Sequence, residues 1–115
     1  MIRDDRVYLS HIVDALQQIT NYTANLDSDD FSSARIVQDA VIRQFEIVGE
    51  ATKNISEEFR MRYPVIPWKD LAGFRDKLIH QYFGVDISLV WRSVVEDVPI
   101  LLEELGGITA SQNKA

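Results

Sequence analysis

Residues 68–82 read WKDLAGFRDKLIHQY, and this stretch contains both a predicted helix and the candidate functional residues. Pro67 suits the first turn of a helix, which we predict from about residue 68 to residue 81. Gly84 follows as a plausible C-terminal stop. The stretch is therefore expected to be a helix that carries Arg75, Asp76 and His80 in its second half.

Apolar residues at helical spacing predict further helices before and after this one. A first helix over residues 4–23 has an apolar stripe: Leu9, Ile12, Val13, Leu16 and Ile19. A long helix over residues 33–53 has Val37, Val41, Phe45 and Val48 on one side. Short helical turns are expected after residues 25–30 and over residues 56–63.

A last helix begins after Asp86, a suitable N-cap, and Pro99 should kink or divide it. No segment alternates like a strand. We therefore predict an all-α, four-helix up-and-down bundle with short additional turns, over residues 1–105, followed by a flexible tail over residues 106–115.

Composition narrows the class of protein. The 115 residues are 46% hydrophobic and include no cysteine, which fits one globular domain without disulfides or thiolate metal sites. No apolar run approaches a membrane span and no signal peptide is evident, so a cytoplasmic protein is expected. The formal charge of −6 opposes non-specific binding to nucleic acid. Residues 51–82, with six basic and four acidic side chains, are the exception.

The pair Arg75 and His80 suggests phosphate chemistry. An arginine can bind a phosphate through two hydrogen bonds, and a histidine can transfer a proton near neutral pH. Attack of an RNA 2′-OH on its own phosphate would need no metal, and no metal site is evident. Five residues of helix separate the pair by about 140°, so a second subunit is one way to complete the site. The spacing alone also fits a surface ion pair and a histidine that caps helix carbonyls.

Three other residues are better explained structurally. His11 has no evident partner in the sequence, so a catalytic role is not expected. Glu46 and Glu50 are four apart on one helix face but have no matching histidine, which favours a surface or interface role over a metal site.

The run Arg-x4-His-x-Tyr at 75–82 resembles the HEPN superfamily, and in particular its HepT-type toxins. The resemblance also includes the segments 39–43 and 49–51, the Tyr63-Pro64-x-x-Pro67-Trp68 motif, and Val90-Trp91. It covers nearly the whole chain.

This resemblance implies a homodimeric helical bundle with metal-independent ribonuclease activity and no cofactor. Arg75 and His80 would be the catalytic pair, with Asp76 as a supporting polar residue. Tyr82 would be the residue that receives AMP, from ATP, through a partner antitoxin of the MNT-type nucleotidyltransferase class. The bulky anionic group would then block RNA.

A non-catalytic alternative is a helical module that binds a nucleotide or docks the nucleotidyltransferase. The acidic charge of the chain suits this alternative somewhat better. The RNA substrate, the cleavage position and the dimer geometry do not follow from the sequence.

Overall fold

The computed structural model describes residues 4–80 and 86–113, and every regular element in these two ranges is a helix. The elements are α1 (Asp5–Thr23), α2 (Ser28–Ser32), α3 (Arg35–Lys53), α4 (Glu57–Arg62), α5 (Trp68–His80), α6 (Ile87–Arg92), a π-helical segment (Ser93–Asp97) and α7 (Val98–Asn113). The predicted all-α class is confirmed for these residues. The four-helix up-and-down bundle and the dimer remain predictions.

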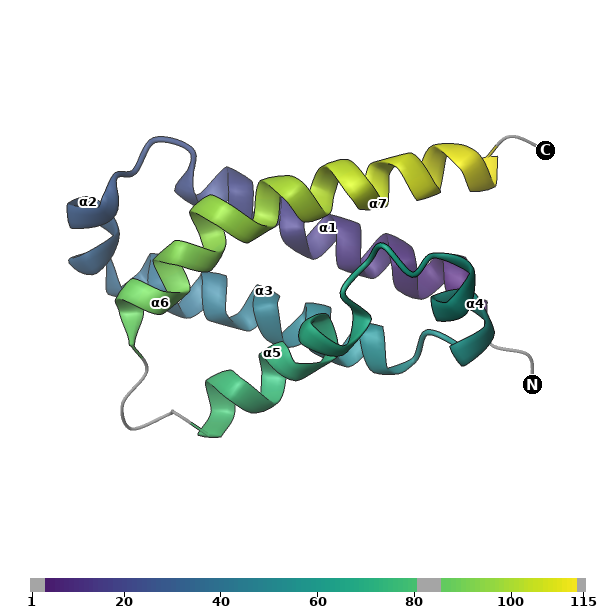
Figure 1. Cartoon of the computed structure of the whole chain (residues 1–115). Coiled ribbons are helices and arrows are strands. Elements are labelled where there is room, and N and C mark those ends of the chain that lie inside the picture. The colour runs from purple at the N-terminus through teal and green to yellow at the C-terminus, as the bar shows by residue number, and fades with distance from the viewer. Residues whose placement is uncertain (1–3, 81–85, 114–115) are drawn as a thin grey trace.

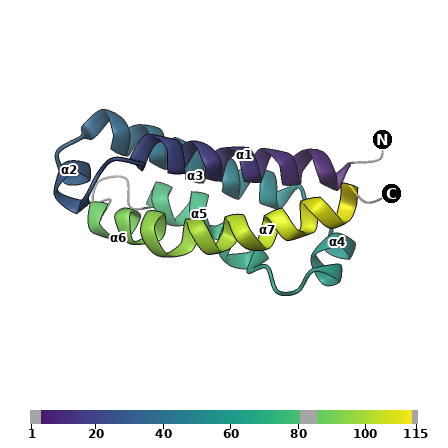
Figure 2. The same cartoon turned by 90° about the horizontal axis from the view of Figure 1, so that it is seen from above.

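The longer helices lie side by side, and the chain direction reverses from α1 to α3, then to α5, and again to α6 and α7 (Figures 1 and 2). Helix α3 packs against both α1 and α5, and α1 also packs against α7. The short helices lie at opposite ends of the molecule, with α2 at the end where α6 begins and α4 near the N-terminus. None of the described helices has the length and hydrophobicity of a membrane span.

The core consists of the apolar stripes that the sequence predicts. From α1 it contains the buried residues Leu9, Ile12, Leu16 and Ile19, and from α3 it contains Val41, Phe45 and Val48. Val13 and Val37 are partly buried and pack against this cluster. Helical spacing places each stripe on one face, so the two longest helices bury their apolar sides against each other.

Asp86 caps α6 as predicted, because its side chain accepts a hydrogen bond from the backbone N–H of Ser88 at 3.0 Å. The Ser88 hydroxyl also donates to this carboxylate, which lowers the pKa of Asp86 below its usual value of 3.8.

Pro99 changes the helix without ending it. Proline has no N–H and crowds the carbonyl of the preceding turn, so the prediction was a kink or a division. The chain forms the π-helical segment just before it, in which the N–H of Val98 donates to the carbonyl of Ser93, five residues back. The α-helix then resumes, with Pro99 as the second residue of α7.

The C-terminal boundary differs from the predicted one at residue 105. Helix α7 continues to Asn113, and both Leu105 and Ile108 are buried in the core. Residues 106–113 are therefore helical, and the described part of the chain has its last core residue beyond the predicted bundle.

Asp5 joins two segments that lie far apart in the sequence. Its carboxylate accepts hydrogen bonds from the backbone N–H and the hydroxyl of Ser56, both at 2.7 Å. The same hydroxyl accepts a hydrogen bond from the N–H of Phe59, so Ser56 is the N-cap of α4. The start of α1 is thereby tied to the start of α4.

We expect Asp5→Ala to lower the free energy of unfolding by roughly 1–2 kcal/mol, because it removes two hydrogen bonds and loosens the cap of α4. Urea unfolding monitored by circular dichroism measures the effect. Asp14→Ala, the same change at an exposed site on the same helix, should cost clearly less. Equal losses in the two variants would contradict this account of Asp5.

Candidate active site

Helix α5 carries the predicted catalytic residues, and its first turn is firmly anchored. The indole N–H of Trp68 donates to the carbonyl of Tyr63 at 3.0 Å, and the Trp68 side chain is only 6% exposed. Its ring also packs edge-on against Phe59 of α4, with 6.0 Å between ring centroids. Leu71, one turn later, is completely buried. These contacts therefore fix the position of the first turn of α5, the helix that carries the candidate residues.

Phe74 provides the next anchor, immediately before the motif. Its ring lies 5.0 Å from that of Phe45, between centroids, and Phe45 is a core residue of α3 that is 1% exposed. Aromatic pairs at this distance contribute attraction beyond the burial of area. The contact holds α5 against α3 directly next to Arg75.

The structure places Arg75, Asp76 and His80 in α5, and His80 is the last residue of this helix. The pair Arg75 and His80 is therefore separated by about 7.5 Å along the axis and about 140° around it. One straight helix does not direct both positions to the same side. Tyr82, the predicted modification site, and Gly84, the predicted helix stop, lie outside the described residues.

The carboxyl end of α5 lies at the end of the molecule where α2 and α6 are found, away from α4 (Figure 1). At this end Phe31 of α2 packs against Trp91 of α6, with ring centroids 5.0 Å apart. Phe31 is completely buried. Helices α2 and α6, joined by this aromatic pair, thus lie at the same end of the molecule as the carboxyl end of α5.

His11 lies elsewhere, on the exposed surface of α1. It contacts Tyr8 edge-on, with 6.1 Å between ring centroids, and lines a cavity of about 340 Å³ together with Arg43 and Glu46. Glu46 pairs with Arg43 at 3.4 Å, which fits the predicted surface role of this glutamate. Among the side chains that the structure describes, those of residues 4–74 and 86–109, no group of three or more metal-ligating residues could hold a metal ion.

A second and larger feature was not anticipated from the sequence. A groove of about 710 Å³ runs between α5 and α7 and reaches Gly73 and Phe74, the residues that precede the motif. A Cβ atom added at Gly73 would meet nothing within 4 Å. The lining residues of the groove come from two stretches that are separate in the sequence, 65–74 and 93–104, so no local pattern indicates it.

Comparison with known proteins identifies the family of the chain. The sequence matches the family described as "Ribonuclease HepT-like" over residues 12–108. The chain belongs to this HepT-like family. The match includes α5 with Arg75 and His80, and the suspected resemblance is therefore confirmed at the level of the family.

Individual relatives of this HepT-like chain carry similar names. It is 46% identical over 101 residues to "Probable ribonuclease HepT" of Thermococcus cleftensis, covering 88% of this chain and 92% of that protein. It is 36% identical over 104 residues to "Putative RNase TTE0752" of Caldanaerobacter subterraneus subsp. tengcongensis, covering 90% of this chain and 93% of that protein.

Another relative is longer. "Gamma-glutamylcyclotransferase and putative RNase MJ0434" of Methanocaldococcus jannaschii is 49% identical over 105 residues, which are 91% of this chain. The chain spans about half of that protein, 47% of its length. No solved structure matches the chain significantly.

Proposed function

We propose that this protein is a ribonuclease toxin that cleaves RNA without a metal ion, at a site made by Arg75 and His80 in a homodimer of four-helix bundles. Membership of the HepT-like family carries the proposal, because the match spans the helix with both residues. The names of the relatives, which refer to ribonucleases, support the same activity.

The chemistry assigns one role to each residue. The neutral imidazole of His80 accepts the proton of the RNA 2′-OH, and the protonated form returns a proton to the leaving 5′-oxygen. Arg75 stabilises the negative charge that develops on the phosphate during attack. Asp76 supports the site as the polar neighbour of Arg75.

Helix geometry is the reason to propose a dimer. Arg75 and His80 are about 140° apart around α5, so a site that uses both is more easily assembled from the arginine of one subunit and the histidine of the other. The proposed partner is an MNT-type nucleotidyltransferase antitoxin, which would transfer AMP from ATP to Tyr82. The added anionic group beside the cleft would repel RNA.

Arg75→Ala and His80→Ala should each lower the rate of RNA cleavage by about 100-fold or more, because each removes a group that acts only in the transition state. The measurement is cleavage of tRNA and mRNA by purified protein, with and without EDTA, after circular dichroism has shown an unchanged helix content. EDTA should not change the rate of the wild-type protein.

Matched controls are available for both residues. His11→Ala removes the other histidine of the chain, and Arg35→Ala removes an exposed arginine at the start of α3. Both should keep wild-type cleavage. Undiminished cleavage by Arg75→Ala and His80→Ala would end the proposal. A wild-type protein that binds the nucleotidyltransferase but leaves RNA intact would favour the non-catalytic docking module.

Mixing the two inactive variants tests whether the site is shared between subunits. If one subunit supplies Arg75 and the other His80, each mixed dimer of Arg75→Ala and His80→Ala retains one intact site. An equilibrated mixture should then recover about one quarter of the wild-type activity, since about half of the dimers are mixed. A site contained in one subunit gives no recovery, so an inactive mixture with demonstrated subunit exchange would contradict the shared site.

Modification of Tyr82 has an independent measurement. Intact mass after co-expression with the nucleotidyltransferase should show one or more added AMP groups, and Tyr82→Phe should remove them. Tyr22→Phe, at an exposed tyrosine of α1, is the control and should leave the modification unchanged. An unmodified wild-type protein under these conditions would rule out this form of regulation.

A further inference from the structure

The groove between α5 and α7 combines an apolar floor with exposed apolar residues at its edges. Leu71 and Leu101 form part of the floor and are 0% and 5% exposed. Val65 and Ile100 line the same groove and are 68% and 57% exposed. Its volume of about 710 Å³ lies in the range of pockets that hold ligands or several side chains. Such exposed apolar surface in a hollow is typical of an interaction site.

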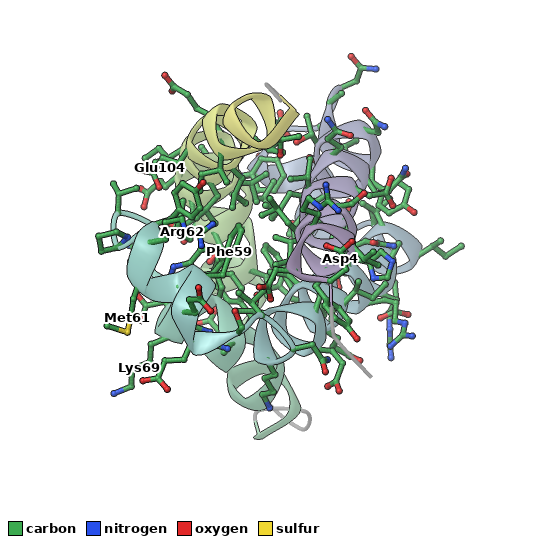
Figure 3. The ribbon with its side chains drawn as sticks, turned by 90° about the vertical axis from the view of Figure 1, so that its right-hand side faces the viewer. Asp4, Phe59, Met61, Arg62, Lys69 and Glu104 are labelled. Carbon is green, nitrogen blue, oxygen red and sulfur yellow. The ribbon has the colours of Figure 1, made fainter. Side chains whose placement is uncertain are left out.

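The charged residues of the groove are mainly acidic. Among the residues that the structure describes, Asp70, Asp97 and Glu104 line it, with Lys69 as the one cation. In the part of the chain that the structure describes, none of these three carboxylates forms an ion pair or a hydrogen bond. Figure 3 shows Glu104 of α7 and Lys69 of α5 on one flank of the molecule, opposite Asp4. The described lining residues of the groove therefore carry a formal charge of −2, and these carboxylates have no partner among the described side chains.

The π-helical segment contributes to the groove as well. Ser93 and Asp97 are its first and last residues, and both line the groove. A π-helical turn is wider than an α-helical one, and such turns are frequent at functional sites. The segment thus places the acidic side chain of Asp97 at the groove. In a regular α-helix the residues after Ser93 would be rotated to other positions around the axis.

The charge of the groove decides between possible occupants. RNA is disfavoured, because phosphate contacts require lysine or arginine and the groove repels anions. A second copy of the same face is also disfavoured, since twofold contact would bring identical carboxylates together. A cationic segment with apolar side chains matches both properties.

We propose that this groove is a docking site for an amphipathic, lysine- or arginine-rich helical segment of a different protein. Its apolar side chains would enter between Leu71 and Leu101, and its cations would pair with Asp97 and Glu104. Helix-in-groove binding of this kind uses apolar anchors spaced at i, i+3, i+4 and i+7. The inference does not depend on ribonuclease activity.

The test uses a synthetic helical peptide with leucines at this spacing and flanking lysines, and a twin with glutamates in place of the lysines. Fluorescence anisotropy gives the Kd, and amide chemical shifts of the full chain give the binding face. We expect the lysine peptide to shift resonances of the groove, such as those of Gly73 and Leu101, and to bind more weakly as salt rises. The glutamate twin should not bind.

Matched variants distinguish binding at the groove from non-specific attraction of the peptide to the acidic chain. The groove variant combines Asp97→Asn with Glu104→Gln, and it should weaken binding of the peptide about three- to tenfold. The control combines Asp14→Asn with Asp39→Asn. It changes the net charge equally but should leave the Kd unchanged. Ile100→Ser should weaken binding about five- to tenfold, but Ile36→Ser, at a residue of α3 that is 85% exposed, should not. His80→Ala should bind like the wild type, so loss of RNA cleavage and loss of docking remain distinguishable.

Three results would overturn the proposal. The first is equal binding of the peptide by the groove variants and their controls, or shifts confined to α1 and α3. The second is movement of the groove resonances with protein concentration and no effect of the peptide, which would assign the groove to a second copy. The third is displacement of the peptide by an RNA oligonucleotide that shifts the same resonances.

Discussion

The position of the motif depends on the contact between α5 and α3, which is centred on Phe74 and Phe45. Phe45 is almost completely buried, so it cannot move without disturbing the core. Phe74, one residue before Arg75, packs against it with the ring planes tilted by 52°. Packed interiors have few voids and transmit displacement. The aromatic pair therefore sets the height and rotation of α5, and with them the place of Arg75 and His80 at one end of the molecule.

Charge is unevenly distributed along the chain. The whole chain is −6, yet residues 51–82 carry a small excess of positive charge. One side of α5 contributes to an acidic groove, while its second half carries the predicted phosphate-binding arginine. A single helix would then repel polyanions along one face and hold a phosphate at its end. If both proposals hold, RNA would be directed toward the end of the helix, and the groove would stay available to a cationic protein segment.

Local patterns predicted those parts of the fold that depend on neighbours in the sequence. The stripes of α1 and α3, the cap at Asp86 and the disturbance at Pro99 all follow from helical spacing or from the chemistry of one residue. Contacts between distant segments have no such signal: the bond from Asp5 to Ser56 spans 51 residues, and the guanidinium of Arg60 reaches the carbonyl of Thr52 in α3 at 2.6 Å. The candidate pair was identified from its residue types and the family pattern, but its assembly needs a geometry that one helix does not provide.

The π-helical segment limits which insertions and deletions the chain can tolerate. A π-helical turn holds one more residue than an α-helical turn, so α6 and α7 form one rod whose two halves are out of phase by about 100°. Deleting a single residue between 93 and 97 would bring the halves back into phase. It would also rotate Leu101, Leu105 and Ile108 away from the core, although no apolar residue had been replaced. Insertions and deletions at this point are therefore constrained more tightly than substitutions, and the length of the segment is as much a part of the fold as its composition.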